Sequence, residues 1–167
     1  MKAHEVIDLL GLQPLEGEGG YFRETYRSCE TVAGDALPDR YRSDRRFSTA
    51  IFYLLTPDAP SLLHRVRSDE IFHFYLGDPV TMLQLHGGGS SEIITIGSNI
   101  MAGERPQVVV PAGVCQGAFL NDGGKWALMG TTVAPGFEFD DFELADRKML
   151  LRNYPQQAEL IRRLTKA

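Results

Sequence analysis

The sequence predicts an all-β domain, an antiparallel sandwich or small barrel with helices at its two ends. Eight segments of strand length are rich in β-branched and aromatic residues, turn-forming residues separate them, and no helical pattern lies between them. The predicted strands are residues 21–26, 48–55, 70–76, 81–85, 92–96, 107–110, 115–120 and 126–133.

Helical patterns flank this region on both sides. Residues 3–10 have helical spacing, and Gly11 can take the left-handed conformation that ends a helix. Residues 144–151 and 156–164 also have helical spacing, and Pro155 stands where a helix can begin. We therefore expect one domain over residues 1–167, with a barrel at about 20–135 and C-terminal helices at about 143–165. These helices are expected to cover a face or an edge of the barrel.

Composition limits the classes of function. The chain has 167 residues, enough to bury a full core without disulfides or a structural metal. A net charge of −5 and a pI near 5.3 argue against nucleic-acid binding. No apolar run approaches the roughly 20 residues that span a bilayer, and the N-terminus lacks the apolar core of a signal peptide. We expect a cytoplasmic protein with neither a nucleic-acid nor a membrane partner.

Two groups of reactive or charged residues have simple interpretations. Cys29 and Cys115 have no metal-binding spacing, so free thiols are expected. A basic cluster is interleaved with Asp39 and Asp44, which is typical of a solvated loop. Its members are Arg40, Arg42, Arg45 and Arg46.

Two segments, residues 63–70 and 111–116, resemble the two signature motifs of the cupin superfamily, in which His-x-His, a Glu and a later His converge on one metal. Residues 18–28, 63–77, 108–116 and 134–144 are similar to a small single-domain cupin family without an assigned activity. The resemblance implies a double-stranded β-helix, the jelly-roll barrel, and a homodimer.

At the four metal-ligand positions of those motifs this chain has His64, Val66, Glu70 and Gln116. A divalent metal, if present, would be held by His64, Glu70 and Gln116. An amide oxygen is a weak ligand for transition metals, and Val66 offers none. We therefore expect no cofactor, and His64 and Glu70 as a hydrogen-bonded pair in a polar pocket.

Successive side chains of a strand point to opposite faces of the sheet, and this alternation indicates which side chains share the pocket. If Glu70 points inward, Phe72 and Phe74 do as well, while His73 points outward unless a bulge shifts the register. The resemblance extends to Tyr21 and Arg23, and Arg23 could donate to an anionic group. The expected site has His64 and Glu70 as catalytic residues. Its expected ligand-binding residues are Gln116, Arg23, Tyr21, Phe72 and Phe74.

Three functional hypotheses remain. The first is a cupin barrel that binds a small polar or anionic metabolite in its central pocket. The second is a metal-free epimerase or isomerase of the sugar-nucleotide type, with His64 as general base and Glu70 orienting it. Its tyrosine acid stays open among Tyr21, Tyr26, Tyr53 and Tyr75. The third is a weakly metal-dependent cupin enzyme. A storage role is disfavoured because long Gln-rich or acidic insertions are absent from the sequence.

Overall fold

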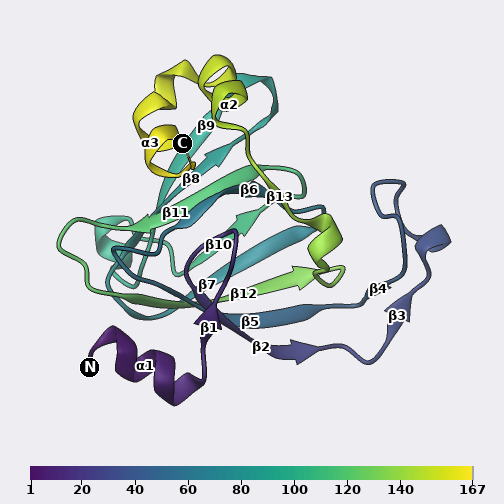
Figure 1. Cartoon of the computed structure of the whole chain (residues 1–167), viewed down its shortest axis with the longest axis horizontal. Coiled ribbons are helices and arrows are strands. Elements are labelled where there is room, and N and C mark those ends of the chain that lie inside the picture. Colours follow the sequence, from purple (N-terminus) through teal and green to yellow (C-terminus); the bar gives the residue numbers. More distant parts are fainter. Residues whose placement is uncertain (167) are drawn as a thin grey trace.

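The structure is a computed structural model that describes residues 1–166. Two antiparallel sheets face each other and form the barrel (Figure 1). One sheet has the order β1-β2-β5-β12-β7-β10, the other has the order β13-β6-β11-β8-β9, and β3 and β4 form a separate pair. The strands are β1 (Gln13–Pro14), β2 (Tyr21–Arg27), β3 (Thr31–Val32), β4 (Arg45–Arg46), β5 (Thr49–Leu55), β6 (Ser61–Arg65), β7 (Asp69–Gly77), β8 (Val80–Leu85), β9 (Ser91–Ile96), β10 (Gln107–Val110), β11 (Cys115–Leu120), β12 (Ala127–Ala134) and β13 (Glu143–Leu144). The predicted all-β jelly roll is confirmed.

All eight predicted strands are present with ends shifted by at most a residue or so. The two-residue strands β1, β3, β4 and β13 were not predicted, and neither was the longer strand β6. Alternation fails in this strand because both of its sides are buried. Leu63 packs among residues of the C-terminal helices, while His64 belongs to a cluster between the two sheets. A strand covered on both sides loses the alternation of apolar and polar residues by which strands are recognised.

The main core fills the space between the two sheets. Residues of both sheets contribute to it, including Tyr53 and Phe72 from the six-stranded sheet and Met82 from the five-stranded one. A second core lies between the five-stranded sheet and the C-terminal helices, and it contains Cys115. Burial raises the pKa of the Cys115 thiol to about 11, so this thiol stays protonated at neutral pH.

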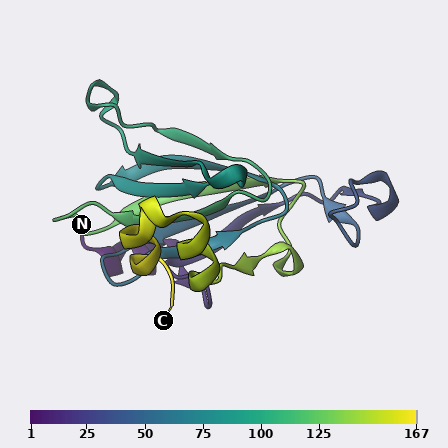
Figure 2. The same ribbon diagram turned by 90° about the horizontal axis from the view of Figure 1, so that it is seen from above.

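The helices lie where the sequence placed them, with one shifted boundary. Helix α1 (Ala3–Leu10) ends at Gly11, whose φ is 60°. The helices α2 (Arg147–Asn153) and α3 (Ala158–Arg163) cover the outer face of the five-stranded sheet (Figures 1 and 2). Helix α2 begins later than the predicted residue 144, because Leu144 pairs with His64 in β13. The Asp146 side chain then caps the helix by accepting from the Met149 N–H.

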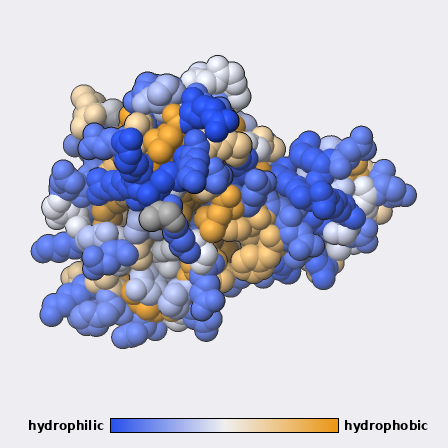
Figure 3. Space-filling view, turned by 45° about the horizontal axis from the view of Figure 1, so that its top comes forward, coloured by the Kyte–Doolittle hydropathy of each residue, from blue (hydrophilic) through white to orange (hydrophobic). Residues whose placement is uncertain are grey.

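Residues 28–46, which we call the arm, project from the barrel beyond β2 and β5 and carry β3 and β4 (Figures 1 and 2). The projecting part is largely hydrophilic (Figure 3). The interpretation of its basic cluster as solvated is wrong for Arg45, which is 1% exposed. Its guanidinium donates to both carboxylate oxygens of Asp141, at 2.8 and 2.6 Å, and this pair ties the arm to the segment after β12. Across residues 1–166, none of the helices is both long enough and apolar enough to cross a membrane.

Candidate functional site

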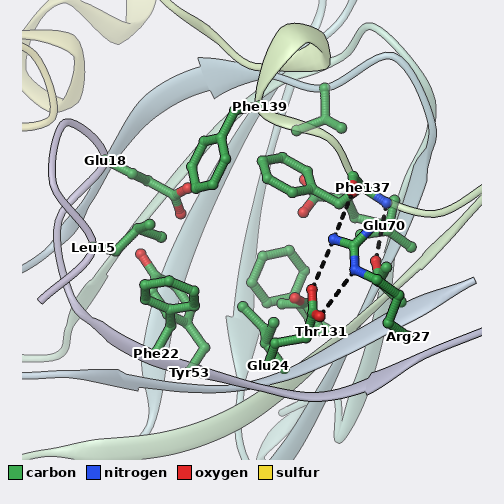
Figure 4. A pocket seen from close by; sticks show the side chains of 15 residues that line it. Leu15, Glu18, Phe22, Glu24, Arg27, Tyr53, Glu70, Thr131, Phe137 and Phe139 are labelled. Carbon is green, nitrogen blue, oxygen red and sulfur yellow. Dashed lines mark hydrogen bonds and ion pairs between the residues drawn. The ribbon is translucent and has the colours of Figure 1, made fainter. Parts of the chain in front are cut away.

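A cavity of about 80 Å³ lies against the inner face of the six-stranded sheet, at the end of the barrel near the arm (Figure 4). Strands β2, β5, β7 and β12 form one side of it, while the loop before β2 and the segment after β12 close over it. Its lining is mostly apolar, with a few carboxylates. The lining residues are Leu15, Glu18, Phe22, Glu24, Arg27, Thr49, Ile51, Tyr53, Val66, Glu70, Phe72, Thr131, Val133, Phe137 and Phe139.

Of the two expected catalytic residues, Glu70 is the one that faces this cavity. It lies near the start of β7, and only 7% of the residue is exposed. Burial raises the pKa of Glu70 to about 7, and the nearby carboxylate of Glu18 adds to the increase. His64 and a hydrogen bond from Gln116 act in the opposite direction. Glu70 can therefore gain or lose a proton near neutral pH.

His64 lies on β6, directly opposite Gln116 on β11, and it does not line the cavity. It is 1% exposed and stacks on Phe142, with ring centroids 5.0 Å apart. Its Nδ1 lies 2.7 Å from the Leu62 carbonyl oxygen, so Nδ1 carries the proton. The lone pair of Nε2 then accepts a hydrogen bond from the Gln116 amide at 3.0 Å.

Gln116 joins the two sheets. Its amide nitrogen also donates to the Oε2 atom of Glu70 at 3.2 Å, across the barrel from His64. Its oxygen is buried and has no hydrogen-bond partner among the described residues. The structure thus brings together His64, Glu70 and Gln116, although only Glu70 reaches the cavity.

Glu18 is a fourth member of this cluster that sequence reasoning missed. It comes from the loop between β1 and β2, and its carboxylate accepts from the Ser61 hydroxyl at 3.0 Å. The His64 Nε2 atom lies 3.9 Å from Glu18 and 3.9 Å from Glu70. The loop contains Gly17, Gly19 and Gly20, a signal of an unusual backbone path, but nothing in the sequence says where that path leads.

Besides Gln116, three expected ligand-binding residues do not line this cavity. Tyr21 packs under α1 on the outer face of the six-stranded sheet, and Arg23 lies over the Phe52 ring at 5.7 Å. Phe22 faces inward instead, because the strand alternates in the opposite sense from the one expected. Phe72 lines the cavity, whereas Phe74 packs against the core without lining it.

A bulge in β2 supplies two unexpected cavity residues. The register against β5 shifts between Glu24 and Tyr26, so that Glu24 and Arg27 both face the cavity. Arg27 donates to Glu24 and to the Phe137 carbonyl oxygen (Figure 4). It also donates to Glu138 at 2.7 Å. This arginine therefore joins β2 to the segment that closes over the cavity.

Of the four candidate tyrosines, only Tyr53 lines this cavity. Its hydroxyl donates to the Gly19 carbonyl oxygen at 3.0 Å. Burial raises the pKa of Tyr53 well above its ordinary value, so the hydroxyl stays protonated. Tyr53 can serve as a hydrogen-bond donor or acceptor, and it also holds the backbone next to Glu18.

The donor set departs from the metal site that the cupin resemblance implies. The His64 Nε2 lone pair, which a metal would need, accepts the Gln116 amide, and Val66 contributes only carbon. Within residues 1–166, no group of three or more His, Cys, Asp or Glu side chains is arranged to hold a metal ion. The residues present therefore do not fit a typical cupin metal.

Comparison with known proteins agrees with this architecture. A family model described as Cupin superfamily (DUF985) matches residues 4–145. The chain belongs to this cupin family. An uncharacterized protein of Saccharomyces cerevisiae is 32% identical over 132 residues, which are 74% of this chain and 66% of the yeast protein. The chain thus spans slightly less than two thirds of that relative.

Two solved structures resemble this cupin along its whole length. A hypothetical protein from Leishmania major has a TM-score of 0.89 and 30% identity, with all of both chains covered. A protein from Shewanella oneidensis has a TM-score of 0.87 and 34% identity, covering 99% of this chain and 98% of its own. These relatives support the family and the fold, and their descriptions state no activity.

The buried position of Glu70 predicts a distinctive pH dependence of stability. Because its pKa rises from 4.5 to about 7 on folding, the folded state binds a proton more tightly than the unfolded state does. The contribution of Glu70 to the free energy of unfolding is therefore highest below pH 4.5. It falls as the pH rises through 7, by roughly 3 kcal/mol at most. Urea unfolding at pH 5 and pH 8 should show the wild type losing stability relative to Glu70→Gln. Parallel pH curves for the two proteins would contradict this assignment.

Proposed function

We propose that this cupin binds a small organic molecule in the barrel cavity, with its apolar part against the aromatic rings and a polar group facing Glu18 and Glu70. One observation carries the proposal: the barrel is not filled at this end, and two carboxylates border the open space, Glu70 buried and Glu18 largely buried. Ligand pockets are generally built this way, from an apolar lining and a few placed polar groups.

The surroundings of the carboxylates support a binding role over a purely structural one. A group that only stabilised the fold would have its polar atoms paired and its apolar surface covered. Here Phe139 borders the cavity with 67% of its surface exposed, and the Gln116 oxygen is buried without a hydrogen-bond partner within residues 1–166. A bound molecule would cover the ring and exclude water from the carboxylates.

A second candidate is metal-free acid–base catalysis, and the position of Glu70 favours it. A general base must reach the proton that it abstracts. Glu70 borders the cavity and titrates near neutral pH, whereas His64 is held behind it by Gln116. An epimerase or isomerase reaction would therefore use Glu70 as base, with Tyr53 as the tyrosine nearest to its substrate.

The binding proposal is tested by filling the cavity. Ile51 lines it from β5, and the adjacent Ala50 does not. A thermal-shift screen of aromatic and branched fragments should yield compounds that raise the melting temperature of the wild type and of Ala50→Trp. Ile51→Trp should lose these shifts because the indole occupies the cavity. Each measurement is made with and without EDTA treatment, and shifts that disappear with EDTA would favour the metal-dependent alternative.

Two outcomes would contradict the proposal. One is a screen without hits on the wild type, and the other is a set of hits that Ile51→Trp still binds as well as Ala50→Trp does. The homodimer and the cytoplasmic location that the sequence implies remain predictions.

A further inference from the structure

The charges around the cavity are strongly one-sided. Its lining contains three carboxylates, those of Glu18, Glu24 and Glu70, and a single cationic side chain, Arg27. In the described chain, neither Glu18 nor Glu70 forms an ion pair with a lysine or an arginine. Their nearest basic neighbour is His64, whose Nδ1 donates to the Leu62 carbonyl oxygen and whose Nε2 accepts from the Gln116 amide.

The one arginine is already neutralised. Arg27 forms ion pairs with Glu24 at 2.9 Å and with Glu138 at 2.7 Å, so its positive charge faces two negative ones at the mouth. An anion entering the cavity would find no free cationic group there, and it would approach two partly desolvated carboxylates. Like charges placed close together in a water-poor site repel strongly.

Aromatic rings complete the environment. Phe72 lines the cavity. Phe22, Tyr53, Phe137 and Phe139 line it as well (Figure 4). The last two rings pack edge to face, with centroids 5.2 Å apart. The faces of aromatic rings carry partial negative charge and attract cations within about 6 Å of the ring centre.

We infer that the ligand of this cavity is an organic cation, a primary ammonium group carried on a small aromatic body. This inference rests on the proposed binding function and names the chemical class of its ligand. The ammonium group donates hydrogen bonds to Glu18 and Glu70. It is the cationic partner that these two carboxylates lack. The aromatic body lies among the phenylalanine rings. This reverses the anionic ligand considered from sequence, which depended on Arg23 facing inward.

A matched set of three probes tests the charge alone. Benzylamine, benzyl alcohol and benzoate share one ring and differ in carrying a positive, a neutral or a negative group. At pH 8, calorimetric titration of the full chain should show benzylamine binding about tenfold or more tightly than benzyl alcohol, with benzoate weakest. Glu18→Gln and Glu70→Gln should each remove most of this preference. Glu92→Gln, on the distant strand β9, removes one carboxylate without touching the cavity and should keep the preference.

The outcomes separate this inference from the proposed function. Equal affinity for benzylamine and benzyl alcohol, or tightest binding of benzoate, would overturn the cationic ligand and leave a binding pocket in place. A preference for benzylamine that both carboxylate variants retain would also overturn it, because the charge would then be recognised elsewhere. Failure of the proposed function is recognised separately. In that case, fragments of every charge would give the same thermal shift with Ile51→Trp as with Ala50→Trp. Two carboxylate variants are used so that one that fails to fold does not decide the result.

Discussion

Replacing Arg45 with alanine is expected to lower the free energy of unfolding by about 3–5 kcal/mol, because it leaves the buried Asp141 carboxylate without its partner. The two side chains are 1% and 0% exposed, and the guanidinium also donates to Ser43 and to the Asp44 carbonyl oxygen. Among the cationic side chains of residues 1–166, only Arg67, at 3.7 Å, still forms an ion pair with the Asp141 carboxylate after the replacement. Urea denaturation measures the loss.

An exposed ion pair serves as the control for this prediction. Arg105 and Glu92 lie 2.9 Å apart with about half of each side chain exposed to solvent. Arg105→Ala should therefore change stability by about 1 kcal/mol or less. Equal effects of Arg45→Ala and Arg105→Ala would show that the arm is not anchored through Asp141.

Anchoring of the arm has a consequence for the cavity. Asp141 belongs to the segment between β12 and β13 that also carries Phe137, Phe139 and the Arg27 partner Glu138. Releasing Asp141 should loosen this segment and weaken ligand binding, even though Arg45 does not line the cavity. We therefore expect Arg45→Ala to reduce the thermal shift of any cavity ligand as well as the stability of the free protein.

Replacing Gly19 with alanine is expected to have a comparably large effect, a loss of about 3 kcal/mol or more in stability. Gly19 has a φ of 106°, which L-residues rarely adopt, and a Cβ atom there would collide with the Pro60 carbonyl oxygen. The backbone next to Glu18 must move to relieve the collision. The Tyr53 hydroxyl would then lose its acceptor, the Gly19 carbonyl oxygen.

Gly17 is the matched control, two residues earlier in the same loop. Its φ is 90°, but no atom lies within 4 Å of the position of a Cβ. Gly17→Ala should therefore show only the backbone strain, about 1–2 kcal/mol. If Gly19→Ala were no more destabilising than Gly17→Ala, or if it bound cavity ligands as tightly as the wild type, the loop would not be what holds Glu18 in place.

The candidate site was only partly accessible from the sequence. His64, Glu70 and Gln116 were chosen because their segments resemble motifs whose side chains converge, and the structure brings them together. Which of them faces the cavity depends on how far each strand stands from the barrel axis. Sequence alternation does not report that distance, so the position of His64 behind Gln116, outside the lining of the cavity, could not be foreseen.

Local signals determined most of the fold. Alternating and β-rich segments bounded by turns fixed the strands, and Gly11 fixed the end of α1, because these features depend on neighbours in the chain. Tertiary structure alone decided the inward turn of Arg27 through a bulge, the approach of Glu18 and the burial of Arg45. The positions of these three side chains depend on contacts with partners 46 or more residues away in the sequence. The free energy of those contacts outweighs the preference of each charged side chain for water.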